Sequence, residues 1–101
     1  MRLGKARAIR INVKDNVATA LQYIKAGEVV EILGGKEVKT VLAKQSIPFG
    51  HKIALKKIGE GEFVVKYGEV IGRATQSIEE GEYVHVHNVE SIRGRGDVID
   101  E

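Results

Sequence analysis

The pattern Ile-x-x-Gly-Glu-x-Val occurs three times in this chain of 101 residues, and it constrains the fold more than any other feature. The copies run from Ile24 to Val30, from Ile58 to Val64 and from Ile78 to Val84, at unequal intervals that do not fit a solenoid. In each copy we expect a core isoleucine, a glycine with positive φ in a turn, a solvated glutamate and a strand that opens on valine. The pattern therefore predicts short strands connected by turns, with a structural role for the glutamates.

Alternation of apolar and polar residues and the positions of turn residues indicate further strands. Gly34-Gly35 is a two-residue signal for a tight hairpin. Short strands separated by glycine turns are typical of a compact, mostly antiparallel β domain. We expect strands at Lys5–Lys14, Val29–Leu33, Val38–Leu42, Lys52–Leu55, Phe63–Tyr67, Val70–Thr75 and Tyr83–Val89.

The segment Asn16–Ala26 has the features of a short helix. Asp15 fits an N-cap, and Gly27 fits a C-terminal stop. Between them, apolar residues recur at the spacing of one helical face, at Val17, Leu21 and Ile24. The sequence therefore predicts a mostly β fold with one short helix.

Composition narrows the class of protein. The chain has the length of one domain, too short for a catalytic domain joined to a binding domain. Without cysteine it forms no disulfide and offers no thiolate ligand, so a metal site would use His, carboxylate, amide or backbone oxygen. The net charge is only +2, which indicates neither nucleic acid nor a membrane as partner. Met1 to Arg10 lacks an apolar core of signal-peptide length, so we expect a cytoplasmic protein.

All three histidines fall in two short segments that begin with glycine, Gly50–Lys52 and Gly81–Asn88. On a strand, His85 and His87 would project from the same face, where two imidazoles can share a metal ion or an anionic substrate. The competing interpretation is that these imidazoles are tolerated polar residues on a half-exposed strand.

The other histidine lies where a turn meets a strand. His51 offers a ligand or a general acid or base near neutral pH, and Lys52 offers a cation for a carboxylate. Alternatively, Pro48 and Gly50 only shape a bend, and Lys52 is solvated. Both interpretations fit the local sequence.

Two further candidates lie elsewhere in the chain. Tyr67, in a turn between strands, either donates a hydrogen bond to a ligand or packs in the core. Arg93 and Arg95, in a glycine-rich charged tail, can each bind a carboxylate or phosphate through two hydrogen bonds. A frayed terminus is the competing account of the tail.

Taken together, three segments resemble the N-terminal domain of the altronate and galactarate dehydratase family: Pro48–Leu55, Lys66–Gly72 and Val84–Asn88. The tail Glu90–Gly96 also matches, and the motifs occur in the family's order. The resemblance runs from about Asp15 to Asp97 and implies a SAF (β-clip) fold, which we place over residues 1–92. The glycines and charges that follow predict a flexible C-terminal tail over 93–101. The resemblance also implies a stand-alone small subunit that pairs with a large catalytic subunit, similar to the small subunit of sulfolactate sulfo-lyase.

The family's reaction removes a proton α to a carboxylate and expels the β-substituent, and it uses a divalent metal, usually iron. The resemblance implies that the large subunit holds most of an iron(II) site, while this chain lines one end of a shared site for an acidic sugar substrate. We expect His51 and His85 to contact metal or substrate, and Lys52 to neutralise charge. The candidates are His51, Lys52 and His85 for catalysis, Tyr67, Asn88, Arg93 and Arg95 for substrate binding, and His85 and His87 for metal.

Other functions stay open at this stage. A SAF domain that binds an acidic sugar without reacting would act alone, whereas a sulfolactate sulfo-lyase small subunit would expel sulfite instead of water. Contact with nucleic acid through the basic first strand is disfavoured by the near-neutral charge and the scarcity of aromatic residues. The sequence leaves the substrate and any homo-oligomer undetermined.

Overall fold

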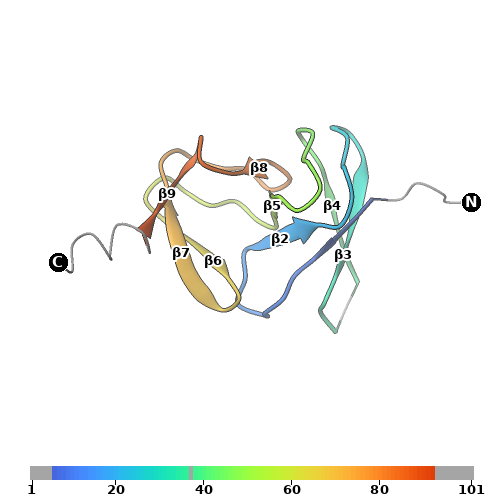
Figure 1. The fold of residues 1–101 in the computed structure, drawn as a ribbon, viewed down its shortest axis with the longest axis horizontal. Helices are drawn as coiled ribbons and strands as arrows, with labels where there is room; N and C mark the ends of the chain where they lie inside the picture. Colours follow the sequence, from blue (N-terminus) through green and yellow to red (C-terminus); the bar gives the residue numbers. More distant parts are fainter. Residues whose placement is uncertain (1–5, 37, 93–101) are drawn as a thin grey trace, which may run out of the picture.

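The computed structural model describes residues 6–36 and 38–92, and it folds them almost entirely into short strands and turns (Figure 1). No helix in this described part of the chain is long and apolar enough to cross a membrane. The strands are β1 (Ala6–Ile9), β2 (Val17–Ala20), β3 (Val29–Leu33), β4 (Lys39–Leu42), β5 (Lys52–Ala54), β6 (Phe63–Lys66), β7 (Glu69–Ala74), β8 (Tyr83–Val84) and β9 (Val89–Ser91).

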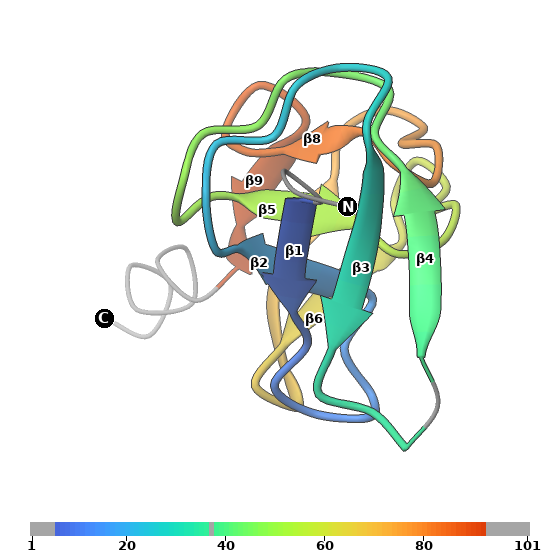
Figure 2. The ribbon, with the colours of Figure 1, turned by 90° about the vertical axis from the view of Figure 1, so that its right-hand side faces the viewer.

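The strands form two sheets. The larger sheet has the order β4-β3-β1-β2-β5-β8, and the smaller has the order β6-β7-β9. The pairing of β1 with β3 is parallel, and Figure 2 shows these two strands running side by side in one direction. The other strand pairs are antiparallel. The expectation of a mostly antiparallel β fold is confirmed.

Two hydrophobic cores share the strand pair β2–β5. In β2, Val17 packs in one core, whereas Ala18 and Ala20 pack in the other. In β5, Ile53 packs in the core that contains Ala18, whereas Ala54 packs in the core that contains Val17. Because successive side chains on a strand point to opposite faces, both faces of this strand pair are buried. The two cores are therefore joined through one central pair of strands.

The repeated pattern extends beyond Ile-x-x-Gly-Glu-x-Val, and in its longer form it occurs four times. Each copy reads Ala-x-x-x-Ile-x-x-Gly, and in each the glycine has a φ between 85° and 93°. Residues other than glycine rarely adopt this left-handed conformation, so the turn itself requires glycine. The copies are Ala20–Gly27, Ala43–Gly50, Ala54–Gly61 and Ala74–Gly81.

The copies hold one another in reciprocal pairs. The Gly27 N–H donates to the carbonyl of Ala43 (2.8 Å), and the Ala43 N–H donates back to the carbonyl of Glu28 (2.9 Å). In return, the Gly50 N–H donates to the carbonyl of Ala20 (2.9 Å). The third and fourth copies along the chain exchange the same bonds. Each turn is thus fixed by the alanine of its partner copy.

The isoleucines of the repeat also pair across the copies. Ile24 pairs with Ile47, and Ile58 with Ile78, each through two backbone hydrogen bonds of 2.8–2.9 Å. All four side chains are buried, one pair in each core. The repeat therefore places two isoleucine pairs at the centres of the two cores.

The three glutamates of the pattern have a structural role, but they are not simply solvated. Each carboxylate accepts a hydrogen bond from the backbone N–H three residues earlier. The N–H groups belong to Lys25 (to Glu28, 2.8 Å), Gly59 (to Glu62, 2.6 Å) and Glu79 (to Glu82, 3.1 Å). Each glutamate closes its own turn.

The predicted helix at Asn16–Ala26 is wrong. Its first half is strand β2, and Ile24 lies in a turn that bridges to Ile47. The apolar spacing arose because β2 is buried on both faces and so lacks the alternation of a half-exposed strand. Asp15 is not a helix cap. Its buried carboxylate accepts backbone N–H bonds from Tyr67 (3.1 Å) and Gly68 (2.8 Å) across the fold.

The strands at either side of Gly34-Gly35 do form a hairpin, but the predicted two-residue turn is wrong. The register pairs Ile32 with Lys39, so the connection is longer. The carbonyl of Arg10 lies against Gly34, where a Cβ atom would clash with it. The glycine thus serves a close backbone contact in addition to the turn. The proposed tail at 93–101 lies outside the described residues.

Candidate functional site

The segment with two histidines is a turn between the two sheets. Strand β8 ends at Val84 in the larger sheet, and β9 begins at Val89 in the smaller one. The predicted single strand Tyr83–Val89 is therefore wrong, and with it the expectation that His85 and His87 share a strand face. Tertiary structure decides this break, because the chain leaves one sheet here to join the other.

Asn88 closes this turn. Its side chain is buried, with Oδ1 accepting from the His85 N–H (2.9 Å) and Nδ2 donating to the Tyr83 carbonyl (2.8 Å). The His85 carbonyl in turn accepts from the Asn88 N–H (3.1 Å). These bonds fix the backbone that carries His85. Both the oxygen and the nitrogen of its amide already form hydrogen bonds within the turn. Substrate contact by Asn88 stays a prediction.

His51 occupies the position at which the other three copies of the repeat have glutamate. In those copies, the glutamate accepts from the N–H of the residue that follows the isoleucine. In this copy that residue is Pro48, which has no N–H to donate. A glutamate here would have no partner in the turn, so the position is available for another side chain. His51 instead bonds to a residue outside its own turn.

Tyr83 is the centre of an aromatic cluster that contains all three histidines. Its Oη lies 2.6 Å from Nδ1 of His51, and its ring stacks on that of His85 at a centroid distance of 5.5 Å. The rings of Tyr83 and His87 are 5.4 Å apart, and those of His51 and His85 are 4.8 Å apart. The structure thus brings the three predicted histidines together, although not by the predicted strand geometry.

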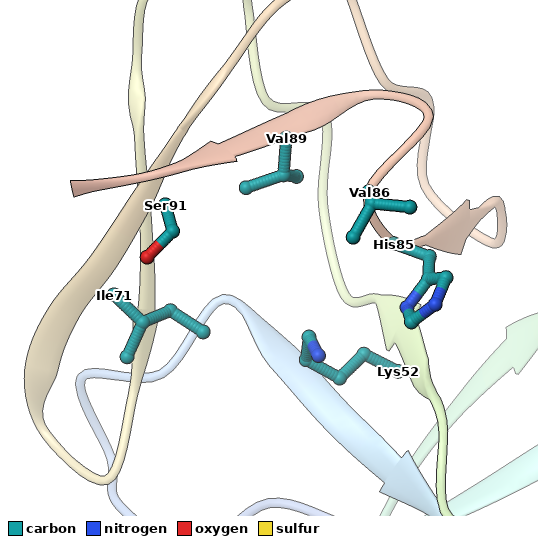
Figure 3. Close-up of a pocket in the computed structure, with 6 residues that line it drawn as sticks. All are labelled: Lys52, Ile71, His85, Val86, Val89 and Ser91. Atoms are coloured by element: carbon teal, nitrogen blue, oxygen red, sulfur yellow. The ribbon is translucent and has the colours of Figure 1, made fainter. Parts of the chain in front are cut away.

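An open pocket of about 320 Å³ lies beside this cluster, between the two sheets. Figure 3 shows Lys52 and His85 on one side of the pocket and residues of the smaller sheet on the other. One wall is therefore cationic or hydrogen-bonding, and the rest is largely apolar. The lining residues are Lys52, Ile71, His85, Val86, Val89 and Ser91.

The charges at the pocket affect two pKa values. Burial lowers the pKa of Lys52 below its ordinary value, and the nearby positive charge of Lys66 lowers it further. Burial also lowers the pKa of His85, and the positive charges of His51, Lys52 and His87 act in the same direction. At neutral pH, His85 therefore favours its neutral form, which carries a lone pair. A lysine cation beside a neutral imidazole suits the binding of an anion next to a proton acceptor.

Among the described residues, the side chains at this cluster do not form a complete metal site. Within residues 6–36 and 38–92, no three His, Asp or Glu side chains are grouped as metal ligands would be. Nδ1 of His51 is already hydrogen-bonded to Tyr83. The assignment of His85 and His87 as metal ligands stays a prediction.

The remaining predicted residues are not part of the cluster. Tyr67 is exposed at the β6–β7 turn with a φ of 60°, and Nζ of Lys66 lies 4.9 Å from its ring centroid. Its packing in the core, one of the two alternatives, is therefore wrong. Arg93 and Arg95 lie outside the described residues.

Sequence reasoning missed Tyr83 as a site residue. It belongs to a copy of the repeat, and that copy was interpreted as purely structural. The available signal was its place two residues before His85 on a predicted strand, where both side chains share a face. Ile71 and Ser91 were also missed, because nothing local indicates that their strands face Lys52 across a pocket.

Two curled sheets with reciprocal glycine turns and a pocket between them define a β-clip domain of the SAF type. The chain belongs to the family described as the altronate/galactarate dehydratase SAF domain, whose sequence model matches residues 6–92.

The chain is similar to two kinds of enzyme. It is 43% identical over 83 residues to an altronate dehydratase of Bacillus subtilis, which covers 82% of this chain but 16% of that protein. It is 54% identical over 50 residues to (2R)-sulfolactate sulfo-lyase subunit alpha of Chromohalobacter salexigens, about half of each chain. The corresponding subunit of Paracoccus pantotrophus is 47% identical over 51 residues, which cover 76% of that protein. The matched region is thus a small part of the dehydratase but most of the latter subunit.

Proposed function

We propose that this chain is the small subunit of a two-component hydro-lyase for acidic sugars, and that it supplies one wall of an active site shared with a large dehydratase subunit. The observation that carries the proposal is a cluster of three imidazoles around Tyr83, beside a pocket that His85 and the half-buried Lys52 line.

The chemistry of β-elimination explains the need for these groups. A base removes the proton α to the carboxylate, the C–O bond at the β-carbon breaks while an acid protonates the departing hydroxyl, water leaves, and the resulting enol becomes a 2-keto acid. Removal of the proton adds negative charge beside an existing carboxylate, so nearby cations lower the barrier. In this scheme Lys52 binds the carboxylate, His51 contacts a substrate oxygen, and His85 contacts a substrate oxygen or receives a proton. The α-proton base would come from the large subunit.

The family's divalent metal, iron(II) in our proposal, would act as a Lewis acid on the substrate oxygens. The large subunit would hold most of its ligands, with His85 and His87 as the contribution of this chain. We further propose Tyr67, Asn88, Arg93 and Arg95 as substrate contacts, and the cytoplasm as the location of the enzyme.

Elimination of sulfite is the second candidate. The sulfolactate sulfo-lyase subunit alpha of Paracoccus pantotrophus matches this chain over 76% of its own length, which supports this candidate. In both candidate reactions Lys52 would bind the substrate carboxylate, because each substrate is a hydroxy acid. The two reactions differ in the group that leaves the β-carbon.

The test is reconstitution with a co-expressed large dehydratase polypeptide, followed by assays for 2-keto acid from altronate or galactarate and for sulfite from sulfolactate. We expect Lys52→Met to lower kcat/KM by on the order of 100-fold, because the variant keeps the stem but loses the cation. Lys56→Met is the matched control, since Lys56 is exposed and absent from the pocket lining. Equal turnover of the two variants would contradict the assigned wall.

Ligand binding by the isolated chain distinguishes a shared active site from a module that binds without catalysis. Calorimetry with altronate and galactarate should detect weak or no binding without the large subunit. Tight binding by the isolated chain would favour the module that binds without catalysis.

A further inference from the structure

The hydrogen bond between Tyr83 and His51 has a chemical consequence for the site. Oη and Nδ1 are 2.6 Å apart, a short bond that joins two residues from different copies of the repeat. A neutral imidazole has one nitrogen that donates and one that accepts, so the partner of Nδ1 decides what Nε2 can do.

The phenol is the better donor of the two groups. A phenol O–H is far more acidic than the N–H of a neutral imidazole, and the imidazole lone pair is the better acceptor. The favoured arrangement is therefore O–H donating to Nδ1.

Tyr83 is also held firmly enough to enforce this arrangement. Its backbone N–H donates to Oε1 of Gln45 (2.7 Å), and its carbonyl accepts from Nδ2 of Asn88 (2.8 Å). Its ring packs against the larger core and stacks on His85 at an interplanar angle of 10°. Both the backbone and the ring of Tyr83 are thus fixed, and so is the position of its hydroxyl.

We propose that Tyr83 is a positioning residue that holds neutral His51 as the tautomer with hydrogen on Nε2, so that His51 presents an N–H donor to ligands. Nε2 then has no lone pair for a metal or for proton abstraction. His51 acts as a hydrogen-bond donor to a substrate oxygen, whereas His85 keeps the role of acceptor. The tautomer rests on geometry alone, and the role toward a hydroxy-acid substrate rests on the proposed function.

Nuclear magnetic resonance of the isolated chain tests the tautomer directly. Long-range ¹⁵N–¹H spectra at a pH where histidines are neutral should give His51 a pyridine-like Nδ1 and a pyrrole-like Nε2. In Tyr83→Phe, which keeps the ring, both nitrogen shifts should move toward the average of two exchanging tautomers. Tyr23→Phe is the matched control, because Tyr23 is exposed and, within the described residues, pairs with no histidine ring; it should leave the His51 shifts unchanged.

Two results would overturn the proposal. One is a pyrrole-like Nδ1 in the wild-type chain, which shows that the phenol accepts. The other is a Tyr83→Phe variant with unchanged His51 shifts. The wild-type spectrum decides the first point even if Tyr83→Phe does not fold, and neither readout depends on enzymatic activity.

Kinetics of the reconstituted enzyme test the donor role. Glutamine can place an amide N–H near the position of Nε2, but it cannot transfer a proton as imidazole does. We therefore expect His51→Gln to retain at least 10-fold more kcat/KM than His51→Ala. Equal losses in the two variants would contradict the donor role while leaving the spectroscopic result intact.

Discussion

Lys52 brings a positive charge into the space between the two sheets. Its ammonium lies beside a pocket with apolar walls, and Lys66 adds a second positive charge nearby. Both conditions disfavour the charged form in the folded protein, and burial is the larger cause. Groups in a cleft whose pKa is perturbed by burial and by a neighbouring charge are common at functional sites.

The lowered pKa of Lys52 makes a prediction about stability. The folded state holds this proton less tightly than the unfolded chain, so the charge destabilises the fold below the folded pKa, and this penalty disappears as the pH rises past the ordinary value of 10.5. Lys52→Met should therefore raise the Tm at pH 7 by a few degrees at most, since Lys52 is only half-buried and solvent screens its charge. Thermal unfolding followed by circular dichroism measures the effect.

Lys56→Met again serves as the control and should change the Tm by less than Lys52→Met. The difference between the two variants should shrink as the pH is raised from 7 toward 10.5. A Lys52→Met variant less stable than the Lys56→Met variant at pH 7 would show that the lysine charge has a stabilising partner.

At the scale of elements, three of the four turns of the repeat contain a hydrogen bond between a glutamate and a backbone N–H of the same turn, and the fourth lacks it. The exception combines Pro48 with His51, where the other copies combine an N–H with a glutamate. Proline removes the donor that a glutamate would satisfy. The same backbone turn can therefore present a histidine to the site without leaving an N–H unpaired.

This interpretation predicts an energetic coupling between residues 48 and 51. Pro48→Lys/His51→Glu gives this turn the same two residue types that form a hydrogen bond at Lys25 and Glu28. We therefore expect a new hydrogen bond from the backbone N–H of residue 48 to the carboxylate of residue 51. The double variant should be more stable than the sum of the two single changes by about 1 kcal/mol. Urea unfolding of the four proteins in this cycle measures the coupling.

Pro48→Lys/His51→Ala provides the comparison, because alanine cannot accept the new N–H. It should show no such coupling. Strictly additive changes in the free energy of unfolding in the glutamate cycle would contradict the coupling between Pro48 and His51. This turn would then share only its backbone conformation with the other three.

For the whole molecule, the important feature is that two cores share one strand pair. β2 and β5 supply side chains to both cores, and each core centres on a bridged pair of isoleucines. Loss of packing in one core therefore weakens the strands that support the other. The pocket lies between the sheets, so its geometry depends on both cores remaining folded.

Ile58→Ala should lower the free energy of unfolding by about 3 kcal/mol, as expected for a fully buried isoleucine. Unfolding should remain a single transition, because the cores are not independent. Urea titrations followed by circular dichroism and by tyrosine fluorescence should therefore coincide.

Val13→Ala is the control, because the side chain of Val13 is 78% exposed. It should lower the free energy of unfolding by less than about 0.5 kcal/mol. Separate transitions in Ile58→Ala would contradict the shared strands.

Much of the fold could be predicted from local signals. Gly27, Gly61 and Gly81 were expected to take positive φ in turns, and they do. Most of the strands lie within the predicted ranges, since their alternation reflects one buried face. Prediction failed for β2, where both faces are buried, and for the segment after Val84, where the chain changes sheets. Both failures concern long-range pairing, which leaves little trace in local sequence.

The sequence by itself determined the turns, the absence of thiol chemistry and the presence of three histidines in two glycine-led segments. These are properties of residue types, such as the freedom of glycine at positive φ. Only the tertiary structure decided that the histidines meet, because they gather around Tyr83 from two turns distant in the chain. It also decided which nitrogen of His51 is engaged, since that depends on a hydroxyl 32 residues away.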